Sequence, residues 1–398
     1  MPGRDLIVIG ASAGGVEAVS AVLGGLPADL HAAVCVVVHL RPDASSQLAA
    51  VLARTTTLPV VAARHGMTLQ PGVVYVGVPD LHMLVERGDS DEATLRLVRG
   101  PRENRTRPSV DPLFRSAALA FGPRVIGVIL SGALDDGTGG LWTVKDQGGM
   151  AVVQDPDDAA VPSMPSSALA EVAVDHVVPA HELGALLGRL AREPVSADLP
   201  GETSQPTDEL AREVGITAMD DVTHMQKERY GRPSRFSCPD CGGVLWELSD
   251  RGPMRFRCEV GHAHSATTLA ETQTEVVEAA MWSALRALED KAELARRRAA
   301  AATARGFPAQ AAHFGVQEQA AQQHASALRA LLRLDGRAGI RPRLHQEHDG
   351  EPLEGERVDV AGRDTDRGAD NGAGTGTTDD AGTAVDGAEY SGSVPRAS

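Results

Sequence analysis

Short, continuous runs of Val, Ile and Leu alternate with longer Ala- and Leu-rich stretches through residues 1–190. Such runs are typical of strands buried on both faces of a parallel sheet, and the stretches between them have the composition of helices. We therefore predict an α/β fold with a doubly wound, mostly parallel sheet. Two further runs, at 81–85 and 93–98, flank a polar segment and predict an antiparallel hairpin appended to the sheet. Strands are expected at 6–9, 33–38, 60–62, 73–76, 125–130, 151–153 and 176–178, and helices at 15–23, 45–53, 112–120, 139–147 and 165–170.

The pattern changes several times in the second half of the chain. Pro, Ser and acidic residues follow residue 192 and indicate a linker, with a short helix beginning near Thr207. Farther on, apolar residues recur at spacings of three and four within an Ala-rich, charged stretch, which predicts one face of a helix. Thr268 and Glu271 could form a capping box at its start. A break at 306–308 separates a second helix, so we expect an antiparallel helical hairpin that packs on a neighbouring domain or on a second copy of the chain.

The last part of the chain is rich in Gly, Asp, Thr and Arg and almost lacks bulky apolar residues. Such a segment cannot bury enough surface to offset its chain entropy, so we expect it to be disordered. The predicted organisation is a catalytic domain at 1–191, a linker with a short helix at 192–235, a zinc-ribbon-like module at 236–265, a helical hairpin at 266–335 and a disordered tail at 336–398.

Composition and charge restrict the partners. The formal net charge is -16 and the chain has no basic stripe, which argues against nucleic acid. No apolar run approaches the ~20 residues that span a bilayer, so no membrane insertion is expected. The N-terminus passes straight from Arg4 and Asp5 into a strand, unlike a secretory signal. Three of the four cysteines form one cluster, which is not a secreted disulfide framework. We therefore expect a cytoplasmic protein.

The first predicted strand ends in the turn Gly10-Ala11-Ser12-Ala13-Gly14-Gly15. A serine here is exposed at the open end of the sheet and close to a helix N-terminus, where developing negative charge is stabilised. The spacing satisfies the G-x-S-x-G pattern of a nucleophile elbow. Two other interpretations stay open: a phosphate- or dinucleotide-binding turn, and a strand–helix turn without chemistry.

Two more predicted strands end on side chains that complete such chemistry. His39 follows the strand at 33–38, and Asp135 and Asp136 follow the strand at 125–130. The carboxyl ends of parallel strands share one edge of the sheet, so a hydroxyl, an imidazole and a carboxylate converge there. One of the two aspartates is expected to be an ordinary turn or helix cap. The backbone amides after Ser12 and near Ala133 are candidate oxyanion donors.

Five segments in the same order resemble the catalytic domain of CheB-type protein-glutamate methylesterases: residues 10–15, 38–40, 107–114, 128–137, and 154–156 with 164–165. The resemblance spans residues 4–190. It implies hydrolysis of glutamate methyl esters on the helical cytoplasmic region of chemoreceptors, and deamidation of certain glutamines. Members of this family in the chemotaxis pathway usually carry an N-terminal receiver domain whose phosphorylation controls the enzyme. Because the catalytic domain of this chain begins at residue 4, such control by an attached receiver is not expected.

The resemblance assigns roles residue by residue. It makes Ser12 the nucleophile, His39 the general base and Asp136 the acid that orients the histidine. Ala13 and Ala133 stand where the family places its oxyanion amides, although the family commonly has Thr and Met there. A motif that contains Arg107, Ser109 and Asp111 is expected to position the site rather than to react.

The cysteine cluster has the spacing of a metal site. Cys238 and Cys241 form a C-x2-C pair, and Cys258 precedes His262 by four residues in a C-x3-H pair. Four such ligands suit a structural, tetrahedral Zn²⁺ and leave no open position for catalysis. His264 could replace His262 as the fourth ligand, and buried free thiols or a redox pair are the rival interpretations. Short strands are expected at 244–248 and 254–257.

These observations predict a serine-type carboxylesterase that needs no cofactor for catalysis and acts on a methylated, chemoreceptor-like protein. The first alternative is a non-catalytic signalling or scaffolding protein that binds partners through the zinc module and the helical hairpin. A nucleotide-binding α/β domain ranks last, because the chain has no Lys-Ser/Thr phosphate loop and no clean G-x-G-x-x-G.

Overall fold

The computed structural model describes residues 3–43, 47–88, 92–195, 208–220, 231–248 and 252–335 of the 398-residue chain. All of these residues fall in one compact unit, 1–344. No helix in the described ranges combines the length and the apolar character that a membrane span needs. The predicted tail at 336–398 lies outside the described residues.

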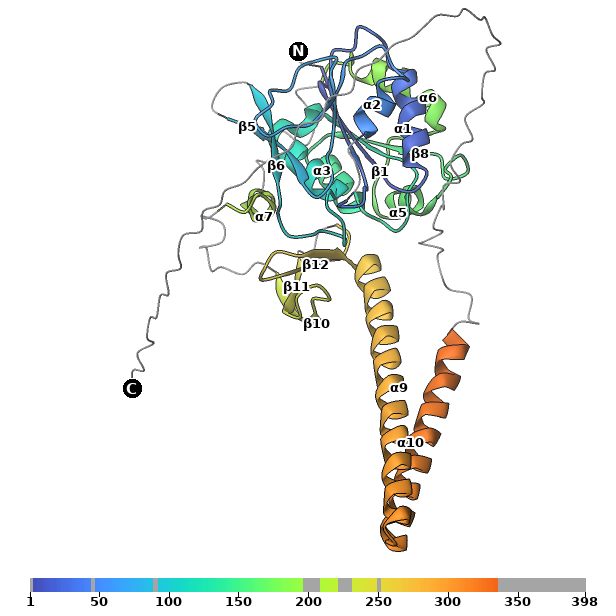
Figure 1. Ribbon diagram of the computed structural model, residues 1–398. Coiled ribbons are helices and arrows are strands. Elements are labelled where there is room, and N and C mark those ends of the chain that lie inside the picture. The colour runs from blue at the N-terminus through green and yellow to red at the C-terminus, as the bar shows by residue number, and fades with distance from the viewer. Residues whose placement is uncertain are drawn as a thin grey trace, which may run out of the picture. The chain divides into compact units, whose positions relative to one another are not determined.

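A seven-stranded sheet with the order β3-β4-β2-β1-β7-β8-β9 forms the centre of the N-terminal part, and every strand pairing in it is parallel (Figure 1). Alternate residues of the central strand β1 face opposite sides of the sheet: Ile7 and Ile9 lie in the core on one side, and Leu6 and Val8 lie in the core on the other. This arrangement explains why the strands are apolar without alternation, and it confirms the predicted α/β class. The strands are β1 Leu6–Ala11, β2 Ala33–Val38, β3 Val60–Ala62, β4 Val74–Val76, β7 Val125–Ile129, β8 Met150–Gln154 and β9 His176–Val178.

Helices cover both faces of the sheet (Figure 1). The core on one face is closed by α1, α2 and α6, and the core on the other face by α3, α4 and α5. Helix α6 was not among the predicted helices, although Leu183, Leu186, Leu187 and Leu190 recur at helical spacing and are buried. The helices are α1 Gly15–Gly24, α2 Leu48–Leu52, α3 Val110–Phe121, α4 Thr138–Asp146, α5 Ser163–Glu171 and α6 Ala180–Leu190.

The predicted hairpin forms a separate two-stranded antiparallel sheet of β5 (His82–Arg87) and β6 (Ala93–Val98). Met83 and Val85 are buried in the same core as α3, and the Val85 backbone N–H donates to the Ser116 hydroxyl of that helix at 3.0 Å. The hairpin is therefore packed onto the sheet layer through α3.

The C-terminal part begins with α7 (Asp208–Ala218), and continues with a four-stranded antiparallel sheet, β10 (Arg232–Ser237), β11 (Val244–Leu248), β12 (Arg255–Cys258) and β13 (Ala263–Ser265). We call residues 231–248 and 252–265 the ribbon. Strands β10 and β13 were not predicted, because Arg232–Ser237 is polar and exposed and β13 has only three residues. The division of the chain into the five segments given above, from the catalytic domain at 1–191 to the tail at 336–398, stays a prediction.

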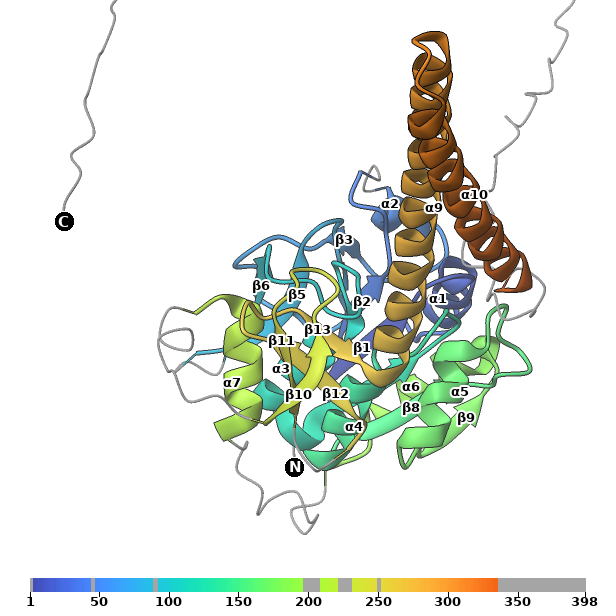
Figure 2. The ribbon, with the colours of Figure 1, turned by 90° about the horizontal axis from the view of Figure 1, so that it is seen from below.

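Two long helices follow the ribbon, α9 (Ala266–Ala304) and α10 (Pro308–Asp335), and lie side by side as an antiparallel pair (Figures 1 and 2). The predicted capping box is wrong. The N-cap of α9 lies three residues earlier than expected, at Ser265, whose hydroxyl accepts from the Thr268 backbone N–H at 2.9 Å. The break at 306–308 falls where it was predicted, with Gly306 at φ 76°.

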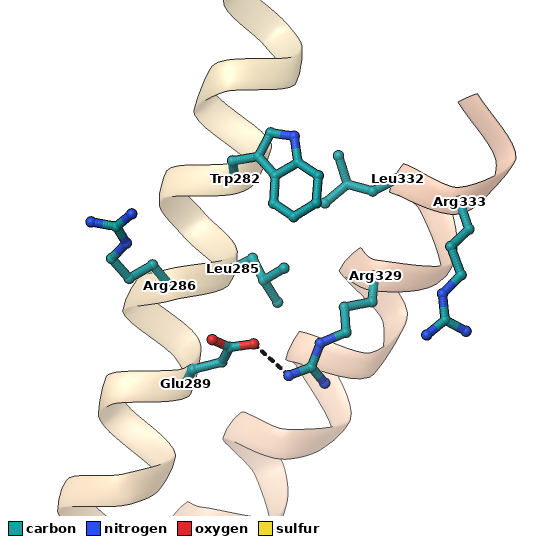
Figure 3. Close-up of a pocket in the computed structure, with 7 residues that line it drawn as sticks. All are labelled: Trp282, Leu285, Arg286, Glu289, Arg329, Leu332 and Arg333. Atoms are coloured by element: carbon teal, nitrogen blue, oxygen red, sulfur yellow. Dashed lines mark hydrogen bonds and ion pairs between the residues drawn. The ribbon is translucent and has the colours of Figure 1, made fainter. Parts of the chain in front are cut away.

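A groove between α9 and α10 is lined by Trp282, Leu285 and Leu332, and the Arg329 side chain crosses it to donate to Glu289 (Figure 3). Trp282 is about half exposed at 54%. Self-association through this helical hairpin stays a prediction.

Candidate active site

Three neighbouring strands of the sheet deliver the predicted site residues to one edge. Ser12 follows β1, His39 follows β2, and Asp136 lies in the loop between β7 and α4. The chain reverses sharply after Ser12 because Gly14, the N-cap of α1, adopts φ 70°, which an L side chain rarely tolerates. The Ser12 backbone N–H donates to the Ser131 carbonyl at 2.9 Å, which ties the serine turn to the loop that carries Asp136.

The three side chains form one hydrogen-bonded row. His39 Nδ1 lies 3.1 Å from Ser12 Oγ, and His39 Nε2 lies 2.6 Å from Asp136 Oδ2. An ionised carboxylate only accepts, so the proton of a neutral imidazole is on Nε2 and the Nδ1 lone pair faces the Ser12 hydroxyl. The His39 side chain is 15% exposed and that of Asp136 only 3%. The base therefore meets the surface, and the acid is held beneath it.

Asp136 is surrounded by donors. Its Oδ1 accepts from Asn104 Nδ2 and Ser109 Oγ, both at 2.8 Å, and its Oδ2 accepts from the Val110 backbone N–H at 2.7 Å. The last of these belongs to the first turn of α3, whose N-terminus favours a negative charge. Burial alone would raise the pKa of Asp136, but the hydrogen bond and charge of His39 and the Val110 and Asn104 donors outweigh it and lower the pKa below its ordinary value. Asp136 is thus held ionised.

The neighbouring Asp135 has different partners. It accepts from the Ser265 hydroxyl at 2.7 Å and from the Thr268 hydroxyl at 3.1 Å, at the start of α9. Burial raises its pKa, against the effect of these hydrogen bonds. Of the two aspartates that the sequence offered, the structure brings Asp136 to the histidine and places Asp135 against a helix N-terminus.

The motif at 107–114 lies behind Asp136. Ser109 donates to Asp136, Asp111 accepts from the Gly140 backbone N–H at 2.6 Å, and Arg107 binds Asp80 at 2.6 Å. Burial, followed by the charge of Asp136, raises the pKa of Asp111 to about 7. None of the three donates to or accepts from Ser12 or His39 among the described residues, and their role in positioning the site stays a prediction.

Sequence reasoning missed Asn104. Its Nδ2 donates to Asp136 and, at 2.9 Å, to Asp111 Oδ2, so one amide group bridges the two buried carboxylates. The only sequence signal is its place three residues before the motif at 107–114. Its backbone has φ 48°, a region that asparagine occupies more readily than most residues.

The candidate oxyanion donors lie beside the serine. Ala13 follows Ser12, and Ala133 follows Gly132, where an added Cβ would lie 2.9 Å from the Ser12 Cβ. Within the described ranges, neither the Ala13 nor the Ala133 backbone N–H has an acceptor. The two amides follow the neighbouring strands β1 and β7, and their role as oxyanion donors stays a prediction.

The cysteine cluster of the ribbon also converges. For a tetrahedral ion with bonds of about 2.3 Å to sulfur and about 2.05 Å to nitrogen, ligand atoms lie about 3.8 Å (S–S) and about 3.6 Å (S–N) apart. Cys241 Sγ and Cys258 Sγ are 3.6 Å apart, and His262 Nδ1 lies 3.6 Å from Cys258 Sγ and 3.8 Å from Cys238 Sγ. The four ligand atoms therefore fit one metal ion.

His264 does not join these four ligands. Its Nε2 faces Asp240 at 3.2 Å and Cys238 at 3.8 Å, in a separate group of three residues. This placement favours His262 as the fourth ligand.

A partly exposed serine, a histidine and a buried aspartate on the edge of a parallel sheet define a serine-type hydrolase domain. The chain belongs to the CheB methylesterase family, whose family model matches residues 7–187. It is 36% identical over 186 residues to a putative protein-glutamate methylesterase/protein-glutamine glutaminase of Leptospira interrogans, a match that covers 47% of this chain and 94% of that protein.

Other relatives are longer. The chain is 41% identical over 192 residues to a protein-glutamate methylesterase/protein-glutamine glutaminase of Nocardioides sp. (48% of this chain, 52% of that protein). It is 37% identical over 186 residues to the protein-glutamate methylesterase FrzG of Myxococcus xanthus (47% and 54%). The solved CheB methylesterase catalytic domain of Thermotoga maritima aligns with a TM-score of 0.46 at 32% identity, over 48% of this chain and 100% of that chain. The ribbon, α9 and α10 lie outside the family match.

Proposed function

We propose that this protein is a serine-type carboxylesterase that hydrolyses methyl esters of glutamate side chains on proteins. The observation that carries the proposal is the unbroken row from Ser12 Oγ through His39 to Asp136, with separations of 3.1 and 2.6 Å. Family membership and the names of the relatives give the ester class, and they do not favour a non-catalytic role.

The geometry suggests an order of steps. Ser12 Oγ attacks the ester carbonyl carbon while His39 Nδ1 takes the hydroxyl proton, and the Asp136 carboxylate stabilises the imidazolium that forms. The amides of Ala13 and Ala133 are placed to donate to the oxyanion. His39 then gives its proton to the departing methoxide, so methanol leaves and a glutamyl ester of Ser12 remains. Water, deprotonated by the same histidine, hydrolyses that ester and frees the glutamate carboxylate and the serine.

The same steps would release ammonia from a glutamine side chain, in keeping with the second activity in the names of the Leptospira and Nocardioides relatives. The proposed substrate is a methylated, chemoreceptor-like protein in a chemotaxis pathway. Support comes from the glutamate methylesterase relatives, FrzG among them.

We also infer that Cys238, Cys241, Cys258 and His262 hold a structural zinc ion. The ligand separations support this inference, as does the small hydrophobic cluster of the ribbon, which consists in the described part of the chain of Cys238, Leu245, Phe256 and Cys258, with Leu269 of α9. A sheet with so small a core needs an additional cross-link. Bound zinc would join the β10–β11 turn to the end of β12, and no catalytic step depends on it.

The test is methanol release from a carboxyl-methylated chemoreceptor signalling domain, measured for the wild-type chain and for Ser12→Ala. Only the wild type should release methanol, and only it should react with a fluorophosphonate probe. Both proteins should give the same circular dichroism spectrum and melting temperature, because the change removes one partly exposed hydroxyl. Full activity of Ser12→Ala would disprove the assignment of the nucleophile.

A further inference from the structure

We propose that β13 of the ribbon is a positioning element for the active site, because its outer edge fixes Asn104, which in turn holds the acid Asp136. The inference rests on the proposed function, since it concerns the same triad. It adds a dependence of that triad on a C-terminal segment outside the family match, which ends at residue 187.

The contact is a strand edge. The pairing of β12 with β13 leaves the Ala263 and Ser265 backbone N–H groups on the side of β13 away from β12. There the loop before α3 adds itself as a short parallel segment. Ala263 N–H donates to the Arg102 carbonyl at 3.2 Å, and Asn104 N–H donates to the Ala263 carbonyl at 2.8 Å. Loop and ribbon are thus joined in the way that an extended peptide joins a sheet edge.

The next donor along this edge determines the side chain of Asn104. The Ser265 backbone N–H donates to Asn104 Oδ1 at 2.9 Å, so this oxygen faces the ribbon. The Nδ2 group must then face the other way, where it donates to Asp136 Oδ1 at 2.8 Å. A single rigid amide therefore links the edge of β13 to the triad acid, and its two ends cannot be exchanged without setting donor against donor.

Buried charges hold the ribbon against this loop. Glu103, next to Asn104 and 1% exposed, accepts from Arg257 of β12 at 3.2 Å and forms an ion pair with Arg115 of α3. Glu213 of α7 binds Arg255 of β12 at 3.0 Å. Separating the ribbon from the loop would remove Arg257 from Glu103 and Arg255 from Glu213, and would leave only Arg115 of α3 to offset the two buried carboxylates, so docking is the state that the charges favour.

The experiment compares two variants of Ser265 in the full-length protein. Ser265 has φ -67°, which proline adopts, so Ser265→Pro fits the backbone while it removes the N–H that binds Asn104. Ser265→Ala is the matched control, because it also removes the hydroxyl but keeps the N–H. Both are measured by p-nitrophenyl acetate hydrolysis and by the labelling rate of Ser12 with a fluorophosphonate probe, with melting temperature and bound zinc as checks of folding.

We expect Ser265→Ala to stay within about twofold of the wild type, and Ser265→Pro to lower kcat and the labelling rate by about five- to tenfold with KM unchanged. Asn104→Gly, which tolerates the positive φ, removes the link itself. When Asn104 is already glycine, the kcat values of the variants with proline and with alanine at position 265 should differ by less than about twofold. A general destabilisation by proline would not depend on Asn104 in this way.

Asn104→Asp tests the link without touching the ribbon. It keeps an acceptor for Ser265 but sets a carboxylate oxygen against Asp136, so it should lower kcat more than Asn104→Gly does. If Asn104→Asp is as active as Asn104→Gly, if Ser265→Pro matches Ser265→Ala, or if the effects of Ser265→Pro and Asn104→Gly multiply, the inference is wrong. A wild type that neither labels at Ser12 nor hydrolyses the ester would overturn the proposed function as well.

Discussion

Replacing Asp136 by asparagine is the sharpest test of the candidate triad, because the neighbouring Asp135 provides a matched control. Asp136 Oδ1 accepts from Asn104, Ser109 and, at 3.4 Å, the Asp111 backbone N–H, and Oδ2 accepts from His39 and Val110. An asparagine has one oxygen, so its NH2 group must face one of these two sets of donors.

Each orientation has a definite cost. With the NH2 group at the Oδ2 position, the Val110 N–H loses its acceptor and His39 can remain bonded only by moving its proton to Nδ1, which removes the base. With the NH2 group at the Oδ1 position, it meets the Asn104 NH2 group. One orphaned donor destabilises the fold by about 1–3 kcal/mol. Loss of the charge behind the imidazolium lowers kcat about 10⁴-fold, which is about 5.4 kcal/mol at 1.36 kcal/mol per factor of ten.

Asp135→Asn should behave differently. Its partners are the Ser265 and Thr268 hydroxyls, which can donate or accept, so both contacts survive the change. Burial raises the pKa of Asp135, so an uncharged side chain is tolerated there. We expect kcat within about threefold of the wild type.

The assay is kcat for ester hydrolysis, together with thermal unfolding of each variant. An active Asp136→Asn would refute the reasoning, and so would an Asp135→Asn chain that folds like the wild type but is inactive.

Four further outcomes are expected. Gly132→Ala would place a Cβ 2.0 Å from Met164 Sδ and 2.9 Å from the Ser12 Cβ, so kcat for ester hydrolysis should fall about tenfold or more. The control is Gly88→Ala, whose added Cβ would have no atom within 4 Å and whose kcat should match the wild type. Arg257→Met removes one buried partner of Glu103 and should lower the free energy of unfolding, measured in urea, by about 3 kcal/mol. The control Arg192→Met breaks an exposed ion pair and should lower it by less than about 0.5 kcal/mol. Equal losses in the two variants would contradict the importance of the buried pair. Burial would raise the pKa of Glu103 and Glu213, but the charges of nearby arginines outweigh it and lower the pKa of Glu103, and that of Glu213 to about 2. In acid the unfolded chain therefore binds more protons than the folded chain. The stabilisation by these two ionised carboxylates is complete above about pH 5 and is lost as the pH falls below about 4.3. The urea midpoint should therefore fall more steeply between pH 5 and pH 3 in the wild type than in Arg257→Met, and parallel curves would disagree. The purified chain should contain one zinc ion that His262→Ala loses and His264→Ala keeps; the reverse result would assign the fourth ligand to His264.

Much of the catalytic half could be predicted from the sequence because its signals are local. Parallel strands such as 33–38 are continuous apolar runs, and their ends place Ser12 and His39 on one edge without any knowledge of distant contacts. The choice of Asp136 over Asp135 needed the family resemblance. Both follow the same strand, and only the fold shows which one turns toward His39.

What the sequence did not show depends on contacts between distant segments. Asn104 looks like an ordinary loop residue, and its importance comes from partners 32 and 161 residues away. Strand β13 exists because β12 and the loop at 102–104 pair with it, not because its three residues favour a strand. Likewise, Ser265 rather than Thr268 caps α9, because β13 brings the chain to that point in an extended conformation.

The position of Cys35 separates the thiols of this protein into two classes. Its side chain lies in the middle of β2 with 0% exposure, and burial raises its pKa far above the ordinary value, so reagents that attack thiolates should not reach it while the sheet is intact. The other three cysteines converge in the ribbon. A thiol titration of the folded chain therefore reports on the ribbon alone, and the fourth thiol becomes reactive only when the central sheet opens.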